Sequence, residues 1–150
     1  MTGTSTGSIA FRTFTIDDYD ALISLWREAG LPCRVAGRDR KDRIERELQH
    51  GVGRMILAEN SGRLIGAVLA THDGRKGWIN RLAVLPAWRR KGLGRLLVEQ
   101  AETWLRGEGL GIFTCLIEEG NDASMMFFSE LGYVKHKDIF YFSKRLYPDV

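Results

Sequence analysis

LAVLPAWRRKGLGRLL is the sequence of residues 82–97, and its order of residue types decides the fold of the chain. The apolar run Leu82-Ala83-Val84 is typical of the end of a buried strand. Pro86 ends that strand, because proline has no N–H to donate to a sheet. The apolar residues that follow the basic turn recur at helical spacing, and they are Leu93, Leu96, Leu97, Ala101, Trp104 and Leu105. The stretch therefore predicts a strand, a turn and an amphipathic helix in direct succession.

The turn and the helix start together predict a binding site for an anion. The first N–H groups of a helix have no partner inside it, and they carry the positive end of the helix dipole. Gly92 and Gly94 have no Cβ, so a phosphate can approach the backbone closely there. The cationic side chains of the turn are Arg89, Arg90, Lys91 and Arg95. This combination predicts a cradle for a diphosphate, whereas an ordinary solvated turn would need neither glycine.

Two motifs of the chain resemble those of one known family. The glycine spacing is neither that of the P-loop nor GxGxxG. Instead, Leu82-x-Val84-x-Pro86 followed by Arg89-x-x-Gly92-x-Gly94 resembles the acetyl-CoA signature of the GNAT superfamily of N-acetyltransferases. A later segment resembles the family's Asn-x-x-Ala-x-x-Leu-Tyr-x-x-Leu-Gly-Phe, and it reads Asn121-x-x-Ser124-x-x-Phe127-Phe128-x-x-Leu131-Gly132-Tyr133.

Hydrophobic periodicity and turn residues divide the whole chain into alternating elements. We expect strands over 9–14, 54–59, 63–71, 77–84 and 112–117, and final strand material over 133–137 and 138–146. We expect helices over 15–29, 39–50, 92–106 and 121–130. This order resembles the GNAT fold, an α/β (α+β) architecture in which helices flank both faces of a mixed, mostly antiparallel sheet. The resemblance predicts a single domain over residues 9–150.

Length and composition limit the remaining possibilities. Residues 1–8 are rich in Thr, Gly and Ser and lack an apolar core, so we expect a disordered tail rather than a secretory signal. No apolar run could span a membrane, and a cytoplasmic location is the default expectation. The net charge of +3 is mild, and the mixed charges of 34–46 look like a solvated helix face without the aromatics of a nucleic-acid site. The two cysteines and three histidines show no ligand spacing, so we expect no metal.

The resemblance implies acetyl-CoA as cosubstrate and a primary amine of a small molecule or peptide as acceptor, joined by direct attack in a ternary complex. Acetyl-CoA would lie where the strand before the cradle splays from the strand after the long helix. The residues carried over as its contacts are Leu82, Ala83, Val84, Arg89, Arg90, Lys91, Gly92, Leu93, Gly94, Arg95, Asn121, Ser124 and Phe128.

The catalytic groups are less clearly marked. The tyrosine that often serves the family as general acid aligns with Phe128, which has no proton to give. Another donor or water would then protonate the thiolate. Glu118 and Glu119 follow the strand beside the splayed gap, and they are the candidates for a base that deprotonates the amine; ordinary solvated carboxylates are the alternative. We expect Cys115 to be a buried strand residue rather than a nucleophile.

The acceptor site is expected around residues 30–42 and 138–142, with Asn80 or Arg81 facing the acceptor and the turn at His72 and Asp73 near its mouth. The arginines at 34, 38 and 40 suit an acceptor with a carboxylate or phosphate. Asp73, Glu118 and Glu119 suit a cationic amine instead, and the sequence leaves both open.

Three other functions remain open at this point. Phe128 favours a non-catalytic module that binds acetyl-CoA, and the cradle alone would serve an interaction domain that binds phosphate on another macromolecule. A protein N-terminal acetyltransferase is the third, although Leu116 stands where those relatives carry a glutamate. A homodimer through the last strands is also left open.

Overall fold

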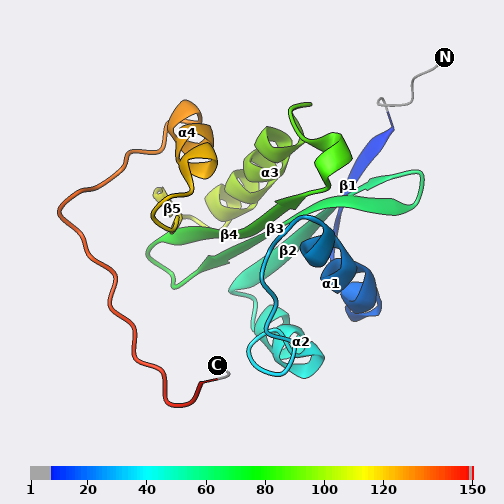
Figure 1. The fold of residues 1–150 in the computed structure, drawn as a ribbon, viewed down its shortest axis with the longest axis horizontal. Helices are drawn as coiled ribbons and strands as arrows, with labels where there is room; N and C mark the ends of the chain where they lie inside the picture. Colours follow the sequence, from blue (N-terminus) through cyan, green and yellow to red (C-terminus); the bar gives the residue numbers. More distant parts are fainter. Residues whose placement is uncertain (1–7, 149) are drawn as a thin grey trace.

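A computed structural model describes residues 8–148 and 150 of the chain (Figure 1). The tail expected over 1–8 lies outside the described residues except for Ser8. The strands are β1 Ile9–Thr13, β2 Gly53–Asn60, β3 Arg63–His72, β4 Gly77–Val84 and β5 Phe113–Thr114. The α-helices are α1 Tyr19–Glu28, α2 Lys41–Gln49, α3 Leu93–Gly107 and α4 Asp122–Glu130. Short 3-10 turns cover Ile16–Asp18 and Pro86–Trp88.

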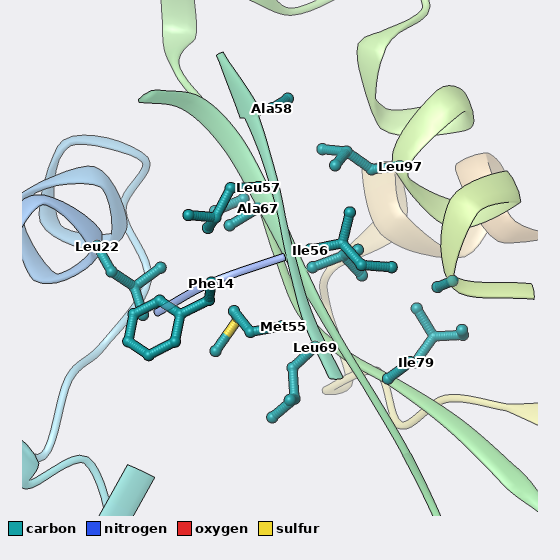
Figure 2. Packing of buried hydrophobic residues seen from close by; sticks show 14 of the residues in the cluster. Phe14, Leu22, Met55, Ile56, Leu57, Ala58, Ala67, Leu69, Ile79 and Leu97 are labelled. Atoms are coloured by element: carbon teal, nitrogen blue, oxygen red, sulfur yellow. The ribbon is translucent and has the colours of Figure 1, made fainter. Parts of the chain in front are cut away.

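The sheet has the order β1-β2-β3-β4-β5. Neighbours from β1 to β4 are antiparallel and follow each other in sequence, whereas β4 and β5 are parallel and are connected through α3. A mixed, mostly antiparallel sheet is therefore confirmed. Figure 2 shows that Leu22 of α1 packs on one face of this sheet and Leu97 of α3 on the other, so the expected helical cover of both faces is also confirmed.

The core lies in two layers because successive side chains of a strand point to opposite faces. Along β2, Met55 and Leu57 point toward α1, and Ile56 points toward α3 (Figure 2). All three are buried, as are their neighbours in β3. The run of buried apolar residues in these two central strands follows from helices covering both faces, and it anchors the strands that lead to the turn at 85–92.

Two glycines of the sheet lie directly against leucine side chains of α3. A Cβ at Gly66 of β3 would stand 2.8 Å from Leu97 Cδ1, and a Cβ at Gly77 of β4 would stand 2.7 Å from Leu105 Cδ1. Real Cβ atoms do not approach other atoms this closely, so a side chain at either position would require the facing leucine of α3 to move. Both glycines therefore make room for side chains by which α3 packs on the sheet.

The strands expected over 133–137 and 138–146 do not form, and β5 is shorter than the expected 112–117. A strand is defined by its pairing with a neighbour, and only Phe113 and Thr114 of β5 pair with β4. Residues 134–148 are all exposed, and within the described chain no hydrogen bond joins 134–146 to residues 8–133. Apolar alternation indicated that this segment can pair, but not which edge it pairs with. None of the described helices is both long and apolar enough to cross a membrane.

Candidate functional site

The turn between β4 and α3 has a backbone conformation that leaves several amides free. Arg90 and Gly92 both lie in the left-handed region, with φ of 61° and 83°. The hydrogen bond from Leu96 N–H to Gly92 O, at 3.1 Å, is the first of the helix. The amides of Leu93, Gly94 and Arg95 therefore have no acceptor within α3.

These amides form the cradle, which we define as the backbone N–H groups of residues 90–95. Among the described residues none of these groups donates a hydrogen bond. They lie at the positive end of a helix of 15 residues, and Arg90, Lys91 and Arg95 beside them are exposed. The arrangement can bind a diphosphate by hydrogen bonds and by charge.

Two side chains of the turn have other partners. Arg89 Nε donates to Val84 O at 3.1 Å, and its Nη2 donates to Ala29 O at 2.7 Å. This arginine thus fastens the turn to the end of β4 and to the end of α1. Lys91 Nζ lies 5.5 Å from the centroid of the Trp88 ring, which is within cation–π range. Sequence alone did not distinguish these contacts from direct contacts with an anion.

The expected splaying of the strands is present beside the cradle. β4 and β5 pair only at Gly77 with Phe113 and at Trp78 with Thr114. Beyond Trp78, the β4 edge that faces away from β3 has no strand partner among the described residues. Leu82 and Val84 are half-buried on this stretch and Ala83 is buried. The outer edge of this stretch of β4 therefore runs toward the cradle without a strand partner.

Helix α4 borders the same region from the side. Asn121 caps this helix, because its Oδ1 accepts a hydrogen bond from the backbone N–H of Ser124 at 3.2 Å. Phe128 is buried, and its ring meets those of Phe127 and Tyr133 edge-on, each at 5.1 Å between centroids. Phe128 thus fills an apolar cluster at the position where the resembled family often has a tyrosine.

Arg81 ties β4 to the loop between α1 and α2. It lies at an irregularity of the β3–β4 register with φ of 53°. Its Nη1 donates to Pro32 O at 2.9 Å, its Nη2 lies 3.2 Å from Asp39 Oδ2, and its guanidinium carbon lies 4.1 Å from the Trp26 ring centroid. Of the two β4 residues considered, Arg81 faces the expected acceptor loop, whereas Asn80 Nδ2 donates to Thr71 Oγ1 at 3.3 Å.

The interpretation of residues 34–46 as a solvated helix face is wrong for Asp39, which is buried. It lies before α2 and is 8% exposed. Its Oδ2 accepts the backbone N–H of Arg34 at 2.7 Å, and the hydroxyl of Tyr19 donates to its carbonyl oxygen at 2.7 Å. No local pattern indicated this burial, because Asp39 stands among charged residues that do face solvent.

The candidate acids and bases differ in their surroundings. Glu118 and Glu119 lie exposed in the loop between β5 and α4. Tyr133 donates its hydroxyl to Glu102 Oε2 at 2.7 Å, and burial together with this carboxylate raises the pKa of Tyr133. Burial also raises the pKa of the Cys115 thiol, which keeps it protonated and agrees with a packing role.

The turn at His72 and Asp73, which was expected near the mouth of the acceptor site, makes contacts within itself and with α3. Asp73 Oδ1 accepts the backbone N–H groups of Arg75 and Lys76, both at 2.8 Å, and these bonds lower the pKa of Asp73. His72 packs on the α3 side, where its ring centroid lies 5.7 Å from that of Trp104. The turn also lies at the opposite end of β4 from the cradle. Within the described residues no group of three or more His, Cys, Asp or Glu could hold a metal ion.

Comparisons with known proteins agree on one family. Residues 19–133 match the model of the acetyltransferase (GNAT) family. Acetyltransferase plu1384 of Photorhabdus laumondii subsp. laumondii is 32% identical over 139 residues, which cover 92% of this chain and 96% of that protein.

Solved structures share the fold at lower sequence identity. The PaiA N-acetyltransferase from Thermoplasma acidophilum, in complex with coenzyme A, has a TM-score of 0.73 at 20% identity and covers 83% of this chain and 88% of its own. The aminoglycoside antibiotic 6'-N-acetyltransferase AAC(6')-IG from Acinetobacter haemolyticus has a TM-score of 0.76 at 20% identity. The match covers 91% of this chain and 99% of that protein.

Proposed function

The chain belongs to the acetyltransferase (GNAT) family, and on that premise we propose that it transfers an acetyl group from acetyl-CoA to the primary amine of a small molecule or peptide. The observation that carries this proposal is the cradle, whose amides have no partner among the described residues. The cradle follows the part of β4 that β5 leaves unpaired. A free row of amides at a helix start suits the pyrophosphate of CoA. Residues 9–150 act as a single acetyltransferase domain in this proposal.

The cosubstrate would extend from the cradle along β4. The amides of 90–95 hold the pyrophosphate, and the exposed side chains of Arg90, Lys91 and Arg95 add charge around it. The backbone of 82–84 pairs with the pantetheine arm on the edge that β5 leaves open. Asn121, Ser124 and Phe128 form the α4 side of this slot. The structural neighbour from Thermoplasma acidophilum is in complex with coenzyme A, which supports coenzyme A as the ligand.

The reaction proceeds by direct attack of the amine on the thioester carbonyl. The amine first loses a proton, and Glu118 or Glu119 accepts it directly or through water. A C–N bond then forms, a backbone N–H stabilises the oxyanion, and the C–S bond breaks. Phe128 has no proton to give and Tyr133 is held by Glu102, so water protonates the leaving thiolate.

The acceptor would bind between β4 and the loop that Arg81 fastens. The loop's exposed cations include Arg34 and Arg40, and the loop between β5 and α4 carries the exposed Glu118 and Glu119. An amine that also bears an anionic group would meet both charges. The likeness to the aminoglycoside N-acetyltransferase from Acinetobacter haemolyticus is one of fold, so it leaves the acceptor class to experiment. The proposal places the protein in the cytoplasm, where acetyl-CoA is available.

One observation favours a second candidate function. The apolar packing around Phe128 and the occupied hydroxyl of Tyr133 leave no tyrosine near the gap for acid catalysis within the described residues. A non-catalytic module that binds acetyl-CoA would have no need of one. This module would bind acetyl-CoA as tightly as an enzyme and release no CoA with any amine.

The experiment is to measure release of the CoA thiol from acetyl-CoA across free N-terminal peptides, amino acids, polyamines and aminoglycosides. Acetyl-CoA binding is measured on the same samples by calorimetry. Release with one class of amine supports the enzyme and identifies its acceptor chemistry. Binding without release in any class favours the non-catalytic module. Absence of binding would contradict both functions, because each depends on the cradle.

A further inference from the structure

A groove lies between α3 and the first two strands of the sheet. Helix α3 packs on β2, β3 and β4, and β1 lies beyond β2 at the edge of the sheet. The space beside the helix is a hollow of about 240 Å³, which we call the β1–α3 groove. The side chains that line it come from β1, β2 and α3, and they include Phe11, Thr13, Arg54, Ile56, Gln100 and Trp104.

The β1–α3 groove continues into a second hollow toward the start of β2. This hollow measures about 300 Å³, and it shares Thr13, Arg54 and Trp104 with the first. Pockets that bind small molecules have volumes of about 300–1,000 Å³. The two adjoining hollows therefore have room for a small ring that carries a polar group.

The groove is separate from the cradle. Trp104 follows Gly94 by ten residues, which corresponds to roughly 15 Å along the helix. Successive residues of a helix are about 100° apart, so Gln100 and Glu102 point to nearly opposite sides of α3. Glu102 accepts the hydroxyl of Tyr133, which follows α4. Figure 1 shows α4 and β1 on opposite sides of α3, so the groove lies on the side of the helix away from α4.

The floor and one wall of the groove are apolar. Ile56 is buried and points toward α3 (Figure 2), and Phe11 beside it is half-buried. The wall is the half-buried indole of Trp104. Aromatic rings pack on such surfaces edge-to-face or offset, so the groove suits a ligand with a flat apolar body.

The groove has one cation that is free to bind a ligand. Among the described residues the exposed Arg54 guanidinium has no hydrogen-bond or ion-pair partner, and it lies 5.5 Å from the Trp104 ring centroid. Arg12 also lines the groove, but its guanidinium donates to both oxygens of Asp18 and of Glu59. A planar guanidinium binds a carboxylate through two parallel hydrogen bonds, so Arg54 alone matches a single carboxylate.

Nearby carboxylates do not compete for Arg54. Within the described residues no Asp or Glu lines the β1–α3 groove itself. Glu108 lines the second hollow, and its Oε1 lies 3.4 Å from His72 Nε2. Because the N–H of Gly74 donates to His72 Nδ1 at 3.0 Å, Nε2 of the neutral ring carries the proton and donates it to Glu108. Glu108 is thus held by its histidine, and the charge available in the groove is positive.

We propose that the β1–α3 groove binds a small organic carboxylate with an apolar ring. The ring lies on Phe11 and Ile56 beside the indole of Trp104, and the carboxylate pairs with Arg54. Gln100 is exposed at the rim and adds an amide donor. The site is distinct from the slot for acetyl-CoA, and it does not depend on the acetyl transfer proposed above.

The test is a titration of the full chain with benzoate, followed by the backbone amide resonances and by the indole N–H of Trp104. The loss of one resonance in Trp104→Phe identifies this indole among the four tryptophans. We expect saturable shifts at the Trp104 indole and at residues 11–13 and 54–56, with a dissociation constant on the order of 1 mM. Benzamide has the ring without the charge and acetate has the charge without the ring, so each should bind at least tenfold more weakly.

Two arginine variants separate the specific pairing from general charge. Arg54→Met keeps much of the side-chain length and should weaken benzoate binding at least tenfold while leaving benzamide binding unchanged. Arg106→Met is the matched control, because Arg106 is an exposed arginine of the same helix that lies over the ring of Phe113, at 5.8 Å from its centroid. This control should bind benzoate as well as the parent chain does.

A third variant fills the groove. Thr13→Trp places a large side chain at an exposed strand position, where aromatic residues are favoured, and it should abolish binding of both benzoate and benzamide. Circular dichroism close to that of the parent shows that each variant is folded. Absence of saturable shifts in the parent, or equal affinity of Arg54→Met and parent for benzoate, would overturn the proposal. Benzoate shifts that gather at residues 90–95 and disappear on addition of acetyl-CoA would overturn it too, because benzoate would then occupy the cradle.

Discussion

Gly94 at the start of α3 lies against the ring of Phe127 on α4: a Cβ added at Gly94 would stand 3.3 Å from both Cε1 and Cζ of that ring. This approach is closer than ordinary van der Waals contact. The glycine therefore has a packing reason, in addition to the access that it gives a phosphate to the backbone. The two reasons can be separated by experiment, because the packing reason depends on the Phe127 ring and the access of a phosphate to the backbone does not.

Gly94→Val should weaken acetyl-CoA binding at least tenfold and lower the free energy of unfolding by about 1–3 kcal/mol through overpacking. Phe127→Ala should relieve the stability effect in the double variant, because it removes the ring that the new side chain meets. It should not restore binding. Calorimetric titration and urea unfolding of both single variants and the double variant make this comparison. If the double variant bound acetyl-CoA as well as Phe127→Ala alone, the glycine would serve packing only.

Gly92→Ala tests the conformation of the turn rather than its space. Gly92 has φ of 83°, and a methyl group at its Cα would meet no atom within 4 Å. Alanine should therefore cost about 1–2 kcal/mol of stability by strain in the left-handed region, and acetyl-CoA binding should weaken as the cradle shifts. Gly109→Ala is the matched control, since Gly109 has φ of 90° and equally open surroundings at the other end of α3. It should lose similar stability and keep full affinity for acetyl-CoA.

Arg81→Met should loosen the loop between α1 and α2 without affecting the cradle. It removes the bonds to Pro32 O and Asp39 Oδ2, and the loss in unfolding free energy should be on the order of 2 kcal/mol. Hydrogen exchange of residues 30–40 should accelerate, while affinity for acetyl-CoA stays the same. Arg40→Met is the control, because the Arg40–Asp42 pair is exposed and contributes little. Unchanged exchange of 30–40 in Arg81→Met would refute the fastening role.

Asp18→Asn should reduce stability at neutral pH and leave it unchanged in strong acid. The Arg12 guanidinium, with Nη2 2.7 Å from Asp18 Oδ1, holds the pKa of Asp18 at about 2, below its ordinary 3.8. A carboxyl with a lowered folded pKa stabilises fully above pH 3.8 and loses that effect as the pH falls toward 2.

Solvent reaches this ion pair from the Arg12 side, so the contribution is on the order of 1 kcal/mol. Urea unfolding of parent and variant at pH 7, 4 and 2.5 measures it. A difference that persists undiminished at pH 2.5 would contradict the assignment to this carboxylate.

Local sequence was sufficient for the parts of the fold that rest on short-range rules. The turn at 85–92 and the start of α3 could be predicted because proline, glycine and apolar spacing act within a few residues. Asp39 and Arg81 could not be predicted as partners, because their contact depends on how the α1–α2 loop crosses β4. The strand predicted over 138–146 does not form, for a related reason. Ile139 to Phe142 have the composition of a strand, but composition does not determine which edge of the sheet a segment pairs with. Phe128 was recognised by alignment with a motif, and only packing revealed its aromatic neighbours.

The most direct test of the central claim is to follow the backbone amide resonances of the full chain while inorganic pyrophosphate, and then acetyl-CoA, is added. We predict that the largest saturable shifts from pyrophosphate occur at the amides of residues 90–95, and that acetyl-CoA displaces pyrophosphate and extends the shifts along 82–84. Shifts that are absent at 90–95, or that gather at another helix start while these amides stay unchanged, would contradict the cradle and the acetyltransferase function built on it.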